Sequence, residues 1–237
     1  MIRQRKFRGA KMDENKYPIV EIFHSVQGEG FHTGVPHVFV RFGNCNLRCE
    51  WCDTDFLTYE EMTLAEIVEK ILSFNCKRVI FTGGEPAMQD LATIGIILKE
   101  KEIHLSIETN GTIPVDPVID WICVSPKDQM YPNSKISQRF GNELKVVYCG
   151  QDLSMYDELK LGFEHHYIQP VYMENDSIES NGKSFQIVED LVKEMDPEGN
   201  VKSSGSGKKF VKMTILVQVH FGSSPFWFKP ILVQAHC

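Results

Sequence analysis

Short apolar runs alternate with helical patterns over most of the chain, and this alternation restricts the folds that the chain can adopt. Seven runs rich in β-branched and aromatic residues predict strands, at 17–23, 36–42, 78–81, 103–107, 121–124, 143–148 and 167–168. Apolar residues at helical spacing predict helices at 63–73, 87–99, 153–159 and 184–194. Thr63 and Glu66 form a capping box at the start of the first of these helices. Strands that alternate with helices indicate a parallel sheet, in which ligand sites gather at the carboxyl ends of the strands.

Composition divides the chain into three parts. Residues 1–16 form a basic N-terminal extension, and residues 17–196 form the core domain. Residues 197–237 combine a flexible linker composition with an apolar, aromatic tail. We expect this tail to add a strand to the edge of the sheet or to form an adhesive surface element.

The charge of the chain is unevenly distributed. The formal net charge is −7, but residues 17–200 alone carry −16, and both ends are basic. Lys and Arg dominate binding to phosphate backbones, so this acidic core disfavours nucleic acid as a partner and favours a small-molecule substrate. No apolar run approaches the ~18 residues of a membrane helix, and the N-terminus lacks the apolar segment of a secretory signal. We therefore expect a cytoplasmic protein without membrane contact.

Three of the seven cysteines lie close together in the segment CNLRCEWC, as Cys45, Cys49 and Cys52. In a chain without a secretory signal, this pattern indicates metal ligation and buried thiols rather than a framework of disulfides. A cubane 4Fe-4S cluster normally has four cysteine ligands, so three on one loop would leave one iron with the open position of a catalytic site. Two other hypotheses use the same cysteines: a zinc site completed by His37, and an electron-transfer cluster completed by Cys76.

A second motif, Gly83-Gly84-Glu85-Pro86, lies between the predicted strand 78–81 and the helix that follows it. Glycines let the backbone approach a ligand closely, and Glu85 can accept hydrogen bonds from an ammonium group. Pro86 suits the first turn of a helix. An ordinary strand-to-helix turn would use the same residues, but the position of the motif downstream of the three cysteines favours a ligand site.

Polar residues follow three later strands of the predicted sheet. Glu108 lies in IETNGT and Gln169 in IQP, while Ser125, Pro126 and Lys127 form the segment SPK. Glu108 and Ser125 offer oxygen atoms to a ribose, Lys127 offers a cation to a carboxylate, and Gln169 offers an amide. Each residue alone is commonly a loop cap, and their shared position at strand ends makes them candidates for one site.

The C-x3-C-x2-C run with an aromatic residue before its third cysteine, followed by GGE, resembles the radical S-adenosylmethionine (SAM) superfamily. The resemblance implies a partial (β/α) barrel of about six parallel strands with outer helices, here followed by a divergent C-terminal tail. It also implies a 4Fe-4S cluster on Cys45, Cys49 and Cys52 that cleaves SAM reductively. The SAM contacts that it implies are Trp51, Asp53, Gly84, Glu85, Glu108, Ser125, Pro126, Lys127 and Gln169.

A longer series of motifs narrows the resemblance. The segments VQGEG, TGVP, WCDT, TGGEP, ETNGT, SPK, LKVV and IQP occur in this order within residues 17–172 and resemble the 7-carboxy-7-deazaguanine synthase (QueE) family. The resemblance implies a lyase that contracts the ring of 6-carboxy-5,6,7,8-tetrahydropterin to 7-carboxy-7-deazaguanine and ammonia, in queuosine biosynthesis. It also implies Mg²⁺ at Thr54. Residues 198–237 differ from the C-terminal segment that closes the substrate pocket in this family.

Residue types in the N-terminal segment suit a carboxylated pterin. The guanidinium group of Arg41 can bind a carboxylate through two parallel hydrogen bonds. The hydroxyl group of Thr82 can face the same ligand. The donors and acceptors of a heterocycle edge need partners of both kinds, which the following residues can supply: Val26, Gln27, Gly28 and Glu29.

The implied partners are a pterin substrate, an electron donor of the flavodoxin or ferredoxin type, and a second copy of the chain in a homodimer. Two other functions use the same cysteine motif. One is a different radical SAM enzyme, such as an activase of glycyl-radical enzymes. The other is a non-catalytic iron–sulfur or zinc protein, in which the cysteines only brace the fold.

Overall fold

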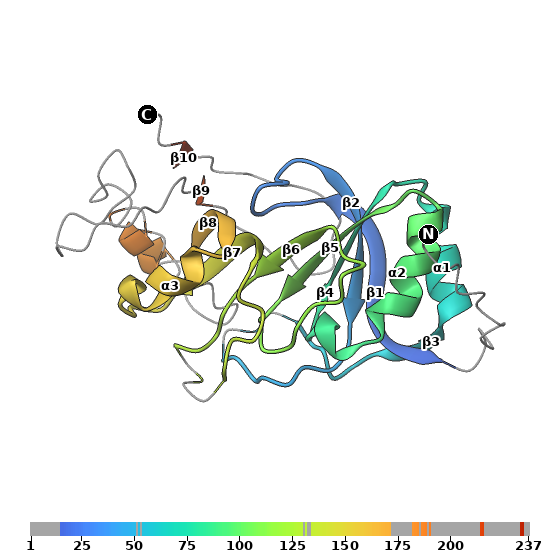
Figure 1. Ribbon diagram of the computed structural model, residues 1–237, viewed down its shortest axis with the longest axis horizontal. Coiled ribbons are helices and arrows are strands. Elements are labelled where there is room, and N and C mark those ends of the chain that lie inside the picture. Colours follow the sequence, from blue (N-terminus) through green and yellow to red (C-terminus); the bar gives the residue numbers. More distant parts are fainter. Residues whose placement is uncertain are drawn as a thin grey trace, which may run out of the picture.

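The computed structural model of the chain describes residues 15–171 except 51, 53, 130, 132 and 133, together with residues 182–184, 186–188, 190, 214–215 and 233–234. Within this part an eight-stranded sheet has the strand order β3-β1-β2-β4-β5-β6-β7-β8 (Figure 1). The strands are β1 Lys16–Val26, β2 Pro36–Phe42, β3 Glu60–Thr63, β4 Arg78–Gly83, β5 His104–Thr109, β6 Trp121–Val124, β7 Gly141–Tyr148 and β8 Phe163–Pro170.

Six neighbouring strands of the sheet are parallel, which confirms the number that the resemblance implied. They are β2, β4, β5, β6, β7 and β8. The sequence did not predict the antiparallel pairing at the N-terminal end, where β1 pairs with both β2 and β3. The loop 27–35 between β1 and β2 is a hairpin connection, shorter than the roughly dozen residues that a parallel crossover needs.

The helices begin where their capping residues lie. Helix α1, Leu64–Ser73, starts with the predicted capping box, in which Thr63 and Glu66 bind each other's backbone N–H groups. The predicted helix 87–99 is two elements, the 3-10 turn η1 Pro86–Met88 and helix α2 Leu91–Glu100, because Asp90 caps α2 by accepting from the Thr93 N–H. The region 153–159 contains η2 Leu153–Tyr156 and α3 Asp157–Lys160.

Alternation along the strands gives the sheet two different faces. One face carries the apolar cores, with Phe42 of β2, Phe81 of β4 and Ile107 of β5 in one cluster and Leu144 and Ile168 in a second. Burial of these side chains stabilises the sheet against its helices by ~1.5–3 kcal/mol for each large apolar side chain. The opposite face therefore carries the residues between them, which are mainly polar. They are Arg41, Thr82, Glu108, Glu143, Lys145 and Gln169.

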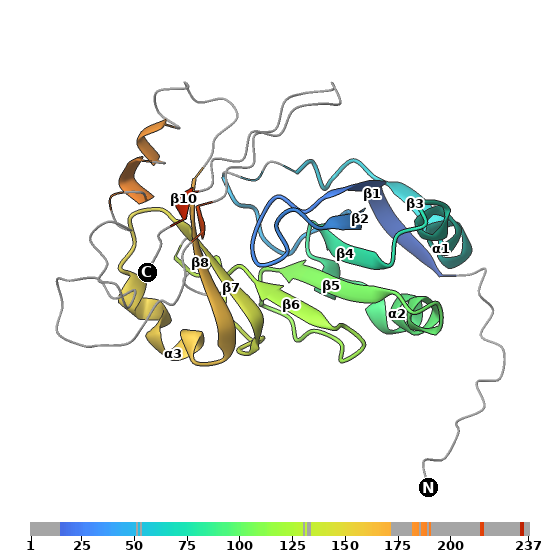
Figure 2. The ribbon, with the colours of Figure 1, turned by 90° about the horizontal axis from the view of Figure 1, so that it is seen from above.

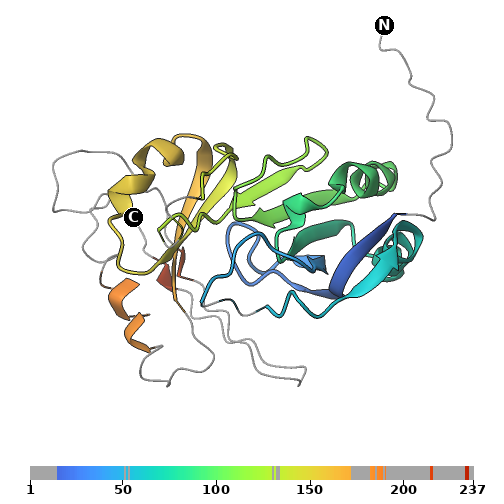
Figure 3. The ribbon, with the colours of Figure 1, turned by 90° about the horizontal axis from the view of Figure 1, so that it is seen from below.

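The sheet is curved but does not close into a barrel. Figures 2 and 3 show strands β4 to β8 in an arc, with α1 and α2 over one part of the sheet and α3 at the other end. This arrangement confirms a partial barrel with helices outside. Strand β3 was not predicted, because its sequence EEMT lacks alternation. In the described part of the chain, no helix is both long and apolar enough to span a membrane.

Two short strands belong to the C-terminal tail, β9 Thr214–Ile215 and β10 Val233–Gln234. They pair with each other and do not extend the eight-stranded sheet. The rest of the tail and the N-terminal extension lie outside the described residues, so the boundaries near residues 16 and 196 stay predictions.

Candidate functional site

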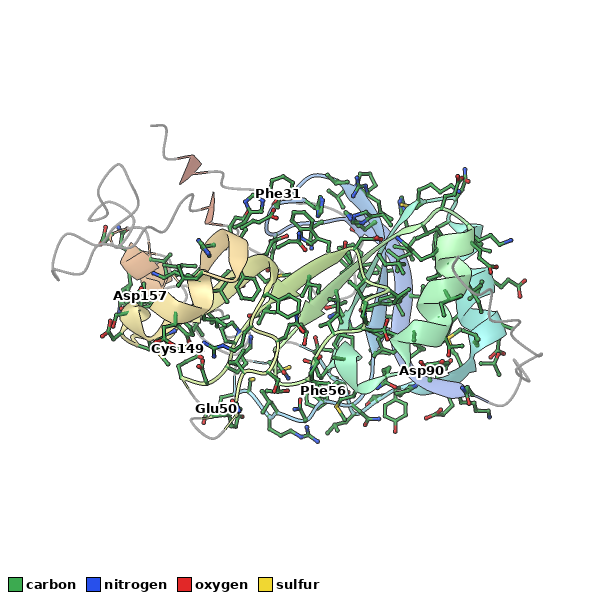
Figure 4. The ribbon with its side chains drawn as sticks, viewed as in Figure 1. Phe31, Glu50, Phe56, Asp90, Cys149 and Asp157 are labelled. Atoms are coloured by element: carbon green, nitrogen blue, oxygen red, sulfur yellow. The ribbon has the colours of Figure 1, made fainter. Side chains whose placement is uncertain are left out.

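The cysteine loop, residues 43–59, follows the carboxyl end of β2 and leads to β3. The hairpin loop 27–35 lies at the opposite end of the parallel strands. Figure 4 shows the two ends, with Glu50 and Phe56 of the cysteine loop on one side of the molecule and Phe31 of the hairpin on the other. The strand ends of β4, β5 and β6 adjoin the cysteine loop, as a parallel sheet requires. The site therefore has a cysteine end and a hairpin end.

Backbone contacts hold the start of the cysteine loop against the glycine pair of β4. The N–H of Gly84 donates to the Phe42 carbonyl at 2.8 Å, and the N–H of Glu85 donates to the Asn44 carbonyl at 2.8 Å. A Cβ atom on Gly84 would lie 1.8 Å from the Asn44 carbonyl oxygen, so only glycine permits this approach. Gly83 has a φ of 111°, which also favours glycine.

A second set of contacts joins the cysteine loop to the end of β5. The side-chain amide of Asn110 donates to Asn46 Oδ1 at 2.9 Å, and the amide of Asn46 donates to Thr112 Oγ1 at 2.8 Å. Asn46 lies between Cys45 and Cys49, so the ETNGT segment fixes the position of the loop. Only Glu108 of this segment was predicted as a site residue, and the part that Asn110 plays was not predicted.

Glu85 is fully buried and accepts three hydrogen bonds from the chain itself. The donors are the Ala87 N–H at 2.9 Å, the Thr109 hydroxyl at 2.7 Å and the Asn110 N–H at 2.8 Å. Burial raises the pKa of its carboxyl group, although these donors oppose the rise. The carboxyl group therefore joins the ends of β4 and β5, and the partly exposed backbone of Gly83 and Gly84 is the part of the motif that a ligand can reach.

The three cysteines of the loop are free thiols near one another. Cys45 and Cys49 are half-buried, Cys52 is exposed, and the Cys52 N–H donates to the Cys49 carbonyl at 3.2 Å. Burial raises the pKa of Cys45 and Cys49, and the neighbouring thiols add to the effect. Lys127 opposes this rise at Cys49, so the SPK segment faces the cysteine loop.

The donor set fits a cluster of several irons better than one ion. Among the described residues, no three side chains of His, Cys, Asp or Glu converge closely enough to hold a single metal ion. Each cysteine of a four-iron cluster binds a different iron, so its ligands need not converge on one point. Three thiols on a partly exposed loop beside Lys127 suit such a cluster, because thiolates ligate iron once their protons are released.

The structure argues against both alternative fourth ligands. His37 is fully buried near the amino end of β2, where its Nδ1 lies 2.9 Å from the Val35 carbonyl oxygen. The sulfur of Cys76 lies 3.6 Å from the carbonyl oxygens of Pro36 and Arg78, at the start of β2 and β4. The cysteine loop leaves the other end of β2, so neither residue can complete a site there.

Arg41 lies near the cysteine end of β2, opposite Thr82 in the register of β2 and β4. Its Nε donates to Glu21 at 2.8 Å and its Nη1 donates to Thr54 Oγ1 at 3.1 Å, and 15% of its side chain is exposed. The guanidinium group is therefore positioned by two partners beside the threonine for which Mg²⁺ is expected. A simpler hypothesis is that Arg41 only forms an exposed ion pair with Glu21. The second contact with Thr54 and the low exposure of the Arg41 side chain argue against this hypothesis.

The SPK segment contributes a half-buried cation near the cysteines. Lys127 donates to the Ser125 hydroxyl at 2.6 Å and to the Ser125 carbonyl at 2.7 Å. Burial lowers the pKa of Lys127, and Cys49 opposes that shift. Pro126 is buried and Gln169 is 9% exposed at the end of β8. Two further expected SAM contacts, Trp51 and Asp53, lie outside the described residues.

The hairpin loop 27–35 packs onto the polar face of the sheet. The N–H of Phe31 donates to Glu143 Oε2 at 3.2 Å, and the ring of Phe31 stacks on His165 and Trp121 with centroid distances of 4.4 and 5.1 Å. The indole N–H of Trp121 donates to Glu143 Oε1 at 2.5 Å. Gly30 approaches Glu143 so closely that a Cβ atom would lie 2.1 Å from its carboxylate. These contacts close the amino end of the arc.

The expected substrate residues of the hairpin differ in burial. Gln27 is 8% exposed and Glu29 and Gly28 are half-buried, whereas Val26 is 40% exposed. Gln27 and Glu29 reach Glu108 and Lys145 on the strands. Lys145 was not predicted as a site residue, although a lysine within the apolar strand sequence LKVVY was a usable signal.

Comparisons with known proteins agree with this site. The model of the radical SAM superfamily matches residues 39–131, which span the cysteine loop, the glycine pair and SPK. A 7-carboxy-7-deazaguanine synthase of Bacteroides thetaiotaomicron is 42% identical over 160 residues, which are 68% of this chain and 85% of that protein. The chain belongs to the 7-carboxy-7-deazaguanine synthase family.

Two further members of the family confirm the resemblance that the motifs indicated. The enzyme of Neisseria meningitidis is 42% identical over 161 residues, which cover 65% of this chain and 75% of that protein. A crystal structure of QueE from Escherichia coli superimposes with a TM-score of 0.63 at 25% identity, and the match covers 86% of this chain and 95% of that one. The fold of the synthase family is thus the fold described above.

Proposed function

We propose that the chain is a radical SAM lyase that converts 6-carboxy-5,6,7,8-tetrahydropterin into 7-carboxy-7-deazaguanine and ammonia. Membership of the 7-carboxy-7-deazaguanine synthase family is the observation that carries this proposal. The cofactors are a 4Fe-4S cluster, SAM and Mg²⁺, and the product enters the biosynthesis of queuosine. When bound, the cluster supplies the electron that cleaves SAM and so provides the radical for ring contraction.

At the cysteine end, we assign the cluster to Cys45, Cys49 and Cys52. The partly exposed backbone of Gly83 and Gly84 lies beside this loop, where it can contact the amino acid part of SAM. The ammonium group of Lys127 faces Cys49 and can neutralise a carboxylate there. Glu108 and Ser125 hold oxygen atoms at the neighbouring strand ends for hydroxyl groups of the ribose.

Between the cysteine end and the hairpin end, we assign the pterin to the polar face of the sheet. Arg41 binds its carboxylate, and Thr54, which already accepts from Arg41, offers a hard oxygen to Mg²⁺. Gln27 and Glu29 present an amide and a carboxylate to the donor and acceptor edge of the ring. The hairpin excludes water at the amino end of the strands, and this shielding protects a radical from side reactions.

An anaerobic assay tests the proposal. The reconstituted protein is incubated with carboxytetrahydropterin, SAM, Mg²⁺ and a reductant, and the product is identified by mass. We expect 7-carboxy-7-deazaguanine only when all components are present. A protein with full iron content that cleaves SAM but yields no deazaguanine would contradict the assignment of substrate.

We also infer a flavodoxin- or ferredoxin-type electron donor and a homodimer, both as properties of the proposed activity. Replacement of the chemical reductant by reduced flavodoxin tests the donor. Light scattering of the reconstituted protein tests the dimer, and a monomer mass at assay concentration would contradict it.

A further inference from the structure

Lys145 is a buried cation that no part of the assignment above uses. It lies in the middle of β7 on the polar face, and only 5% of its side chain is exposed. Its ammonium group donates to Glu29 Oε2 at 2.6 Å and to Glu108 Oε2 at 2.6 Å. A lysine is rarely buried without such partners, because removing its charge from water is costly.

The two carboxylates come from different parts of the site. Glu29 belongs to the hairpin, and Glu108 lies at the end of β5. Gln27 closes a ring between them, because its amide donates to Glu108 Oε1 at 2.8 Å and its carbonyl accepts from the Glu29 N–H at 3.2 Å. Lys145, Glu29, Gln27 and Glu108 thus form a ring of hydrogen bonds that connects the hairpin with the strand ends. Lys145 is the cation of this ring.

The charges in the ring depend on one another. Burial alone would raise the pKa of Glu108, but the charge of Lys145 and hydrogen bonds from Lys145 and Gln27 lower it overall. Burial alone would lower the pKa of Lys145, but Glu108 and Glu29 raise it well above its ordinary value. Lys145 and Glu108 therefore form an ionised pair, and Glu29 shares the same ammonium group. Without that group the carboxylates would repel each other within the same small volume.

We propose that Lys145 is a positioning residue that fixes the carboxylates of Glu29 and Glu108 relative to each other, so that pterin and SAM bind in a set arrangement. This inference rests on the proposed function, in which Glu108 contacts SAM and Glu29 contacts the pterin. A lysine can hold both carboxylates at once because its ammonium group has three hydrogen-bond donors. The hairpin and the strand ends then act as one binding unit.

The test uses the full, anaerobically reconstituted protein and the variants Lys145→Met and Lys99→Met. Methionine keeps the length of the side chain and removes the charge. Lys99 is the matched control, since it pairs with Asp120 near the end of α2 and 40% of its side chain is exposed. Three quantities are measured: the Kd of SAM without pterin, the Kd of pterin with SAM but without reductant, and SAM consumed per product formed.

We expect Lys145→Met to weaken both ligands by about tenfold or more, the loss typical of a hydrogen bond to a charged group. SAM consumed per product should also rise, because a misplaced pterin leaves SAM cleavage unproductive. Lys99→Met should stay within about twofold of the wild type, the small effect typical of an exposed ion pair. Wild-type values of both Kd in a folded Lys145→Met protein would overturn the proposal.

A second variant decides the matter if Lys145→Met fails to fold or to take up iron. Glu29→Gln removes the charge on the hairpin side only, so the hairpin loses its ion pair with Lys145 and Glu108 is no longer fixed relative to the hairpin. We expect SAM affinity to fall at least threefold, although Glu29 itself is assigned to the pterin. Unchanged SAM affinity would overturn the proposal. The Kd of SAM is measured without turnover in both variants. A wild-type protein that forms no product would therefore contradict the proposed substrate but would leave this test of Lys145 intact.

Discussion

Replacement of Gly84 by alanine tests how tightly the cysteine loop is attached to the sheet. The added Cβ would lie 1.8 Å from the Asn44 carbonyl oxygen and 2.5 Å from its carbon, so the two backbones must separate by more than about 1 Å. Separation breaks two backbone hydrogen bonds, from Gly84 to Phe42 and from Glu85 to Asn44. Overpacking costs about 1–3 kcal/mol and each lost bond about 0.5–1.5 kcal/mol.

The expected loss of stability is therefore about 2–6 kcal/mol, or roughly 4–24 °C in the Tm of a chain of this size. The assay is thermal unfolding of the iron-free protein, followed by the iron and sulfide content after reconstitution. Gly182→Ala is the control, because nothing lies within 4 Å of its added Cβ. If Gly84→Ala took up a full cluster and melted with the wild type, the close contact between loop and sheet would be refuted.

Four shorter predictions concern other groups of the chain. Cys49→Ala should lose the cluster, by iron and sulfide count, while Cys76→Ala should keep it, and full iron content in the former would refute the ligand assignment. Arg41→Lys should bind carboxytetrahydropterin about 10- to 150-fold more weakly, since an ammonium group lacks the two parallel donors of a guanidinium group, and an unchanged pterin titration would count against this. Thr54→Ala should need more Mg²⁺ for activity, and an unchanged Mg²⁺ titration would count against that. His32 belongs to the hairpin loop, where its ring centroid lies 4.5 Å from that of Trp121. Burial and the nearby Arg78 lower the pKa of His32 to about 4, so the folded state leaves it unprotonated where the unfolded state binds a proton. Stability from this source should be lost as the pH falls from 6.5 towards 4, and His32→Gln should flatten Tm in that range.

The alternation of strand and helix patterns in the sequence was sufficient to predict the parallel part of the sheet. The run HVFVRF alternates between apolar core residues and polar-face residues, and helices α1 and α2 each start at a capping residue. The antiparallel pairing of β1 was missed because an apolar run shows where a strand lies and not its direction. The length of the loop 27–35 was the available signal.

The cysteine loop and the glycine pair could be placed together from the sequence because neighbouring parallel strands end at one edge. The ring around Lys145 could not be predicted, because it joins residues separated by 37 and 116 positions through the fold. The part that Glu85 plays shows the same limit. Its motif was recognised, but its three internal donors depend on β5 lying next to β4.

The hairpin that closes the amino end of the arc has a consequence for how the enzyme matures. Its contacts with Glu143 and Trp121, and the ring through Lys145, involve no cysteine of the loop and no metal. We therefore expect the hairpin and the ring to form before iron arrives and to persist when oxygen damages the cluster. Repair of an air-exposed molecule would then require rebuilding of the cysteine loop alone, while the surface proposed to bind the pterin stays as the chain folded it.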